Sequence, residues 1–155
     1  MLVPLLLNYY LWRMLNQKII NSNKNIWSRR LALQAIYSWN INGISFEEIL
    51  SNFKVENDYK KCNQSYFKEI VSGVINNHKD IDVIIEENNH LDVKLVNMVE
   101  MSIIRCATYE LCFLKKHDYK ILISEYTKLS KKFGTNDSPK YVNAIVDSIS
   151  KSKNG

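Results

Sequence analysis

From Ile26 onward, hydrophobic residues recur at intervals of three and four, which is the period of one face of an α-helix. The clearest of these stripes run through residues 31–39, 66–75, 91–114 and 141–149. No segment alternates polar and apolar residues for long enough to predict a strand. The pattern therefore predicts an all-α protein, a compact bundle of about seven helices joined by short loops.

Capping residues mark several of the expected helix ends. Gly43 follows the first stripe, and Ser45 with Glu48 forms the S-x-x-E capping box of a second helix. Gly134 follows the stripe that ends at residue 133, as a helix-terminating glycine does. The sequence just after it predicts a cap and then Pro139 at the first position of the last helix.

The first 25 residues differ from the rest. Their apolar start has no basic residues before it and no small-residue cleavage site after it, so it does not fit a signal peptide. Asn8 and Arg13 interrupt it before the roughly 20 residues that a membrane span needs. Residues 16–25 are polar and have the composition of a linker. We expect residues 1–25 to be a disordered or loosely docked extension, with an amphipathic membrane-surface anchor as the alternative. Residues 26–150 are then the helical domain, and 151–155 a polar tail.

Length and charge narrow the class of protein. A chain of 155 residues with 46% hydrophobic and 24% charged residues fits one soluble globular domain. Its net charge of +5 permits a polyanionic partner without requiring one. Three cysteines without close pairing indicate a reducing compartment, the cytoplasm. The chain has 17 lysines and only 4 arginines, so each arginine is a candidate for a role that needs a planar guanidinium.

Catalytic patterns are missing from the sequence. His78, His90 and His117 are 12 and 27 residues apart, without the spacing of metal ligands. The adjacent glutamates at 47–48 and 86–87 point in different directions on a helix, and no phosphate-binding or nucleophile motif is present. We expect no enzymatic activity, no cofactor and no metal.

Two basic segments are candidates for binding an anion. Lys24, Arg29 and Arg30 lie around the expected start of the first helix, where cations oppose the helix dipole unless they face phosphate together with the free N–H groups. The second segment runs from Lys131 to residue 143. It includes Tyr141, which either packs in the core or stacks on a base.

Four motifs stand in a fixed order between residues 26 and 149. They are R-R-x-x-x-Q-A-x-Y-x-W at 29–39, Y-F-x-x-x-V-x-G-V at 66–74, I-R-x-x-x-Y-E-L at 104–111 and K-K-F-G-x-x-D-S-x-K-Y-V-N-x-x-V-D at 131–147. In order and spacing they resemble the NusB family of transcription antitermination factors. The segment around F-G-x-x-D-S is the most specific of the four.

The resemblance implies two packed helical subdomains and a non-catalytic function. Such proteins bind the boxA element of ribosomal RNA leader transcripts together with the ribosomal protein NusE. The complex joins RNA polymerase with other Nus factors and suppresses premature termination. The implied partners are therefore boxA RNA, NusE and the antitermination complex, with no membrane, and a homodimer stays open.

The resemblance and the charge pattern together give a set of candidate RNA-binding residues: Lys24, Arg29, Arg30, Tyr37, Arg105, Asp137, Lys140 and Tyr141. Of these, Lys24, Arg30 and Lys140 rest on charge and location alone. Glu100 matches a position associated with the NusE interface.

The sequence departs from the family pattern in three places. The usual run of arginines before the first helix is replaced by K-N-I-W-S at 24–28, which removes phosphate contacts. Pro139 stands where a histidine is usual, and the N-terminal extension has no family counterpart. Two alternatives follow: a helical protein-interaction module with weak or lost RNA binding, or an RNA-binding domain like those of rRNA cytosine methyltransferases. The second lacks a methyl-donor site in this chain.

Overall fold

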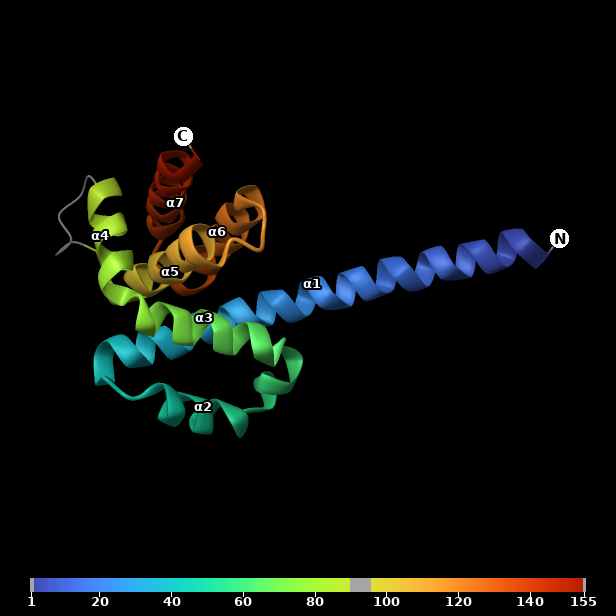
Figure 1. The fold of residues 1–155 in the computed structure, drawn as a ribbon, viewed down its shortest axis with the longest axis horizontal. Helices are drawn as coiled ribbons and strands as arrows, with labels where there is room; N and C mark the ends of the chain where they lie inside the picture. The colour runs from blue at the N-terminus through green and yellow to red at the C-terminus, as the bar shows by residue number, and fades with distance from the viewer. Residues whose placement is uncertain (1, 90–95, 155) are drawn as a thin grey trace.

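The fold is helical throughout the part of the chain that the structure describes (Figure 1). This computed structural model describes the backbone of residues 2–89 and 96–154 and the side chains of residues 9–89 and 96–152. The elements are α1 (Leu2–Asn42), α2 (Phe46–Lys54), the 3₁₀-helix η1 (Asn57–Lys61), α3 (Gln64–Asn76), α4 (His78–Asn88), α5 (Met98–Tyr109), the π-helix η3 (Glu110–Leu114), α6 (Tyr119–Phe133) and α7 (Ser138–Asn154). The all-α prediction is confirmed.

The helices form two groups that meet at α5. In one group α1 packs along α3, with α2 and η1 beside them; in the other, α4, α6 and α7 pack around α5 (Figure 1). α5 also contacts α1 and α3, so it is the common wall of both groups. This arrangement agrees with two packed helical subdomains.

The core is built from the predicted stripes. Phe67, Ile103, Tyr126 and Val146 are fully buried, each from a different helix. Aliphatic and aromatic side chains of this size stabilise a fold by about 1.5–3 kcal/mol each when buried. The hydrophobic period therefore identified the correct face of each of these helices.

The predicted helix ends are partly right. Ser45 caps α2, where its Oγ accepts a hydrogen bond from the Glu48 N–H at 3.2 Å. Gly134 does end α6, but with an extended backbone, φ −92°, and not the expected left-handed one. A Cβ at Gly134 would lie 2.5 Å from Ser138 Oγ, so the glycine is needed for the close approach of α7. Pro139 is at the second position of α7, one later than expected.

α1 begins far earlier than the sequence pattern suggested. It is helical from Leu2, so the expectations of a helix start near Ile26 and a linker over 16–25 are wrong. The physical reason is that residues 5–42 contain no glycine or proline, the residues that stop a helix. The division into an extension and a folded domain at residue 26 stays a prediction. No helix in the described ranges is long and apolar enough to cross a membrane.

The helix expected over residues 91–114 is also different. α5 begins at Met98, and residues 90–95, including His90, lie outside the described residues. After Tyr109 the chain continues as the π-helix η3, which ends at Lys115 in the left-handed region with φ 53°. Hydrophobic spacing at three and four cannot distinguish one wide turn from an α-helical turn.

A buried ion pair joins α1 to η3. Arg29 Nε donates to Glu110 Oε2 at 3.0 Å, and the two side chains are only 4% and 1% exposed. The hydroxyls of Tyr66 and Tyr126 also donate to this carboxylate, Tyr126 at 2.5 Å. Burial raises the pKa of Glu110, while the Arg29 charge opposes that rise. The network connects α1, α3, η3 and α6 at one point.

Removal of one partner of this pair should destabilise the fold strongly. We expect Arg29→Met to lower the free energy of unfolding by about 3–5 kcal/mol, because the Glu110 carboxylate is left buried without a cation. Urea unfolding measures this loss. The double variant Arg29→Met/Glu110→Leu should recover part of the loss, since neither charge then remains. A single variant as stable as the wild type would show that the pair is not structural.

Candidate nucleic-acid interface

Cations and aromatic rings alternate across one surface beside the base of the long helix. The Arg30 guanidinium lies 4.6 Å and the Lys61 ammonium 4.5 Å from the Trp27 ring centroid. Arg30 also lies 5.3 Å from the Phe133 ring. We call this surface the basic face; its residues are Lys24, Trp27, Arg30, Lys61, Lys132 and Phe133. Such contacts hold the cations in place and leave ring surface beside them.

Backbone contacts of Ser28 explain how distant lysines reach this face. Ser28 Oγ lies 2.8 Å from the Asn63 carbonyl oxygen and 2.9 Å from the Lys24 carbonyl oxygen, and donates to both. Asn63 N–H donates to the same Lys24 oxygen at 3.3 Å. The segment after η1 is thereby held against α1, and it brings Lys61 next to Trp27.

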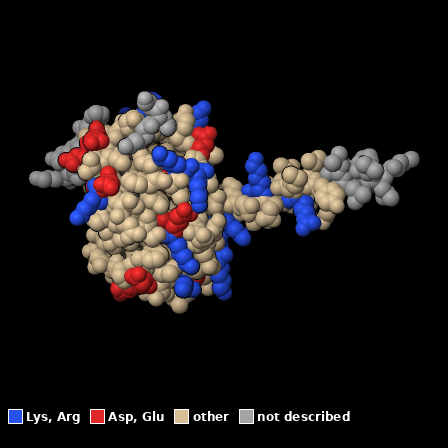
Figure 2. Space-filling model, viewed as in Figure 1, with Lys and Arg blue, Asp and Glu red and all other residues tan. Residues whose placement is uncertain are grey.

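The charge of the basic face is predominantly positive. In Figure 2, Lys and Arg side chains gather on the side of the body from which α1 emerges, with one acidic group nearby. Asp58 pairs with Lys61 at 2.8 Å, but both side chains are about half exposed, and such pairs are weak in water. An anionic ligand can therefore compete for Lys61.

A shallow groove continues from the basic face past Tyr37. Its lining residues are Leu33, Gln34, Tyr37, Ser38, Val99 and Phe133, and its volume is about 290 Å³. An adjoining hollow shares Tyr37, Val99 and Phe133 and extends to Gly134 and Thr135. Tyr37 is 38% exposed, so its ring is accessible from this groove. The structure thus brings Lys24, Arg30 and Tyr37 onto one continuous surface.

Asp137, Lys140 and Tyr141 form a second group. They line a cavity of about 420 Å³ between the end of α4 and the start of α7. The Tyr141 hydroxyl donates to Asn89 Oδ1 at 3.0 Å, and the ring is half-buried. Burial, with the charge of Glu100 as a smaller cause, raises the pKa of Tyr141, so the hydroxyl stays protonated. Both readings of Tyr141 are therefore partly right: it packs, and it also lines a cavity.

Arg29 does not lie on the surface. Its guanidinium is held by Glu110 and Tyr66 inside the core, so the expectation that it contacts phosphate directly is wrong for this structure. Successive helical residues point about 100° apart, and the core takes Arg29 while Arg30 faces outward.

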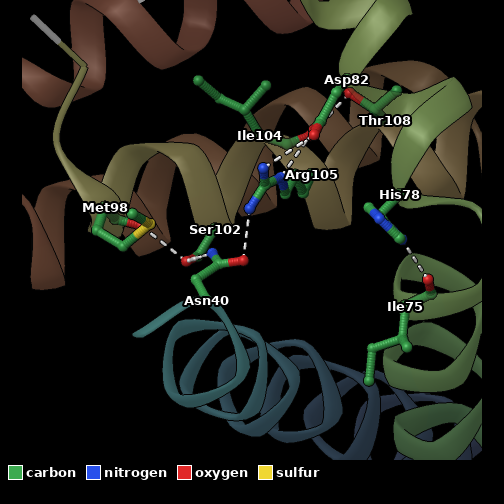
Figure 3. A network of polar contacts seen from close by, with 9 residues as sticks. All are labelled: Asn40, Ile75, His78, Asp82, Met98, Ser102, Ile104, Arg105 and Thr108. Carbon is green, nitrogen blue, oxygen red and sulfur yellow. Dashed lines mark hydrogen bonds and ion pairs between the residues drawn. The ribbon is translucent and has the colours of Figure 1, made fainter. Parts of the chain in front are cut away.

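Arg105 is a structural tie. Figure 3 shows its side chain between α4 and α1: Nε and Nη2 donate to the Asp82 carboxylate at 2.8 and 3.0 Å, and Nη1 donates to Asn40 Oδ1 at 2.5 Å. Asn40 in turn donates to Ser102 Oγ at 2.8 Å. The planar fork is fully used within the protein, so the structure gives Arg105 no free donor edge for RNA. The prediction that an arginine here has a geometric role is right, but its ligand is a carboxylate.

Glu100 lies beneath the turn between α6 and α7. It is 8% exposed, and Oε1 accepts a hydrogen bond from Ser138 Oγ at 2.6 Å. Its own N–H donates to Asn97 Oδ1 at 2.8 Å, which caps α5. Glu100 therefore fixes the start of α7, near Tyr141, and presents little surface to a protein partner. Its assignment to the NusE interface stays a prediction.

The titratable groups in the core are not arranged for chemistry. Burial raises the pKa of the Cys106 thiol to about 12, and burial lowers the pKa of His117, which is neutral at pH 7. His78 Nδ1 is hydrogen-bonded to the Ile75 carbonyl at 2.8 Å. Among the described residues, no group of three His, Cys, Asp or Glu side chains could hold a metal ion.

Sequence reasoning missed several residues of the basic face. Trp27 and Arg30 are three apart, a spacing that makes them neighbours on a helix, so this contact was readable from the sequence. Lys61 comes from another element, and no local pattern links it to Trp27. Lys132 and Phe133 stood within a quoted motif, but the lysine was explained by the helix dipole alone.

Comparison with known proteins agrees with this architecture. The chain is 40% identical over 120 residues to the transcription antitermination protein NusB of Pseudoalteromonas translucida, covering 77% of this chain and 88% of that protein. It is 40% identical over 124 residues to the protein of that name from Shewanella denitrificans, covering 79% and 92%.

Solved structures lead to the same family. A crystal structure of antitermination factors NusB and NusE in complex with dsRNA matches with a TM-score of 0.69 at 25% identity, covering 82% of this chain and 96% of that one. The solution structure of NusB from Aquifex aeolicus matches with a TM-score of 0.65 at 25% identity, covering 81% and 86%. The NusB family model matches residues 27–151, which contain the basic face from Trp27 onward and both tyrosine surfaces. The chain belongs to the NusB family, whose curated members among these relatives are named transcription antitermination proteins.

Proposed function

We propose that this protein is a non-catalytic antitermination factor of the cytoplasm that binds boxA RNA of ribosomal RNA leader transcripts together with NusE. In this role it joins RNA polymerase and other Nus factors and suppresses premature termination. The observation that carries the proposal is the basic face, which gathers cations and aromatic rings from α1, η1 and α6. A similar protein has been solved with NusE and dsRNA, which supports the same classes of partner here.

The basic face supplies the two contacts that single-stranded RNA needs. Lys24, Arg30 and Lys61 neutralise phosphates, which provides affinity without sequence preference. Trp27 and Tyr37 offer ring surface on which unpaired bases stack. The Arg30 Nε–H is buried without a hydrogen-bond partner among the described residues, which is costly unless a ligand or solvent satisfies the group. Lysines from three elements thus take the place of the missing arginine run.

Asp137, Lys140 and Tyr141 form the second RNA-binding group of the proposal. Their cavity is largely apolar in character around the Tyr141 ring and has one exposed carboxylate and one exposed ammonium at its edge. A base in this cavity would contact the ring, and the Asp137 carboxylate would accept from a base amino group. Arg29, Arg105 and Glu100 act in this proposal as positioning residues, because their side chains hold the surrounding helices.

The first test compares two pairs of lysines. We expect Lys61→Gln/Lys132→Gln to weaken binding of labelled boxA RNA in fluorescence anisotropy, while Lys79→Gln/Lys120→Gln, with the same charge change away from the basic face, leaves it nearly unchanged. Each lost phosphate contact should reduce the slope of log affinity against log salt by ~0.7, so the first pair should reduce it by roughly 1.4.

The same titration decides between the RNA and protein-module alternatives. Binding of boxA should exceed that of a scrambled RNA, and NusE should strengthen it; by linkage, RNA must strengthen NusE binding by the same factor. If boxA is not preferred even with NusE bound, the RNA part of the proposal fails and a helical protein-docking module remains.

The second test concerns Tyr141. We expect Tyr141→Leu to weaken boxA binding by about 1–3 kcal/mol, because a stacked base loses its ring. Tyr141→Phe removes only the hydrogen bond to Asn89 and should keep most of the affinity. If both variants bind like the wild type while their thermal unfolding is lowered, Tyr141 is a packing residue and contributes nothing to RNA binding.

A further inference from the structure

The N-terminal part of α1 extends away from the body of the protein (Figure 1). We call residues 9–23 the arm. Its large side chains are in solvent: Trp12 is 60% exposed, Met14 69% and Leu15 61%. The printed side-chain hydrogen bond within the arm joins Gln17 and Asn21, one turn apart. The arm therefore presents a helix surface that the described body does not cover.

The arm is amphipathic. Leu11, Leu15 and Ile19 are spaced four apart, so they form one stripe along the helix, with Trp12 beside it. Residues 13, 17 and 21 are Arg, Gln and Asn, also four apart, and they lie on the opposite side. Ile20 and Tyr10 fall outside the apolar stripe, which widens the hydrophobic surface toward the polar side.

An apolar stripe on an isolated helix calls for a partner. Most helical stability in proteins comes from burial of an apolar face, and contiguous exposed apolar surface marks an interaction site. The arm has eight large exposed hydrophobic side chains: Tyr9, Tyr10, Leu11, Trp12, Met14, Leu15, Ile19 and Ile20. Its helix is thus expected to persist on a surface that covers them.

The charge of this region selects the partner. The first 46 residues contain no Asp or Glu, while Arg13, Lys18 and Lys24 are positive. Figure 2 shows basic and no acidic side chains on the described part of the arm. Two arms of this composition would place like charges together, which disfavours a second copy. RNA would satisfy the cations but would leave the aliphatic stripe in water.

We propose that the arm binds the surface of an anionic phospholipid bilayer. Leu11, Trp12, Leu15 and Ile19 lie at the boundary of the acyl chains, and the cations lie among the head groups. Trp12 and the neighbouring tyrosines have the side chains that favour this depth. The arm lies along the membrane, since no described helix could cross it. This inference revises the sequence-based expectation of no membrane partner and is independent of the proposed RNA binding.

The test is co-sedimentation of the full chain with vesicles. We expect binding to phosphatidylcholine vesicles that contain phosphatidylglycerol, much weaker binding to phosphatidylcholine alone, and weakening by salt. Leu15→Glu/Ile19→Glu should weaken binding about tenfold or more, because two charges enter the apolar stripe. Gln17→Glu/Asn21→Glu adds the same two charges at the same spacing on the opposite side and should bind clearly more tightly than the first variant.

Three outcomes would overturn the proposal. A wild-type chain that stays in the supernatant with both kinds of vesicle excludes lipid as the partner; if light scattering then shows a dimer that Leu15→Glu/Ile19→Glu dissociates, the partner is a second copy. If that variant instead loses boxA affinity, the arm binds RNA. Equal loss of vesicle binding by both variants would show that charge alone acts. All four substituted side chains are outside the core, so unchanged thermal unfolding of the body confirms that the variants are folded.

Discussion

The buried pair of Arg29 and Glu110 determines how α1 sits on the rest of the protein. A guanidinium and a carboxylate inside a core are costly unless their hydrogen bonds are satisfied, and here Tyr66 and Tyr126 complete the set around the carboxylate. Only one rotation of α1 about its axis makes these bonds. That rotation directs the next residue, Arg30, outward to Trp27 and Phe133. The surface chemistry of α1 therefore depends on a contact in the core.

The backbone that carries Glu110 is unusual in the same place. α5 gives way to the π-helix η3 at Glu110, and the wider turn closes where Lys115 N–H donates to the Glu110 carbonyl at 2.9 Å. Such turns insert an extra residue and change the direction of the side chains that follow. The change of helix type coincides with the point where α1, α3 and α6 meet around one carboxylate.

The candidate RNA surface is assembled where helices end or join. Lys61 stands at the end of η1, Phe133 at the end of α6, and Tyr141 in the first turn of α7. Gly134 allows α7 to start close to α6, and Glu100 of α5 holds Ser138 in that turn. Polar side chains inside the fold thus position those that face a ligand, without contacting it themselves.

The sequence by itself determined the helical class, the core faces and the family motifs, because each depends on local spacing or on residues within one segment. The contact of Trp27 with Arg30 belongs to the same category, since helical neighbours are three apart. Which arginine is buried was not readable: Arg29 and Arg30 are chemically identical, and only packing against Glu110 separates them. Likewise, Arg105 is a candidate for any acidic partner until α4 brings Asp82 to it. Lys61 joins α1 only through the Ser28–Asn63 contact. Tertiary structure decided these roles because the partner of each cation lies tens of residues away, where no periodicity along the chain could identify it.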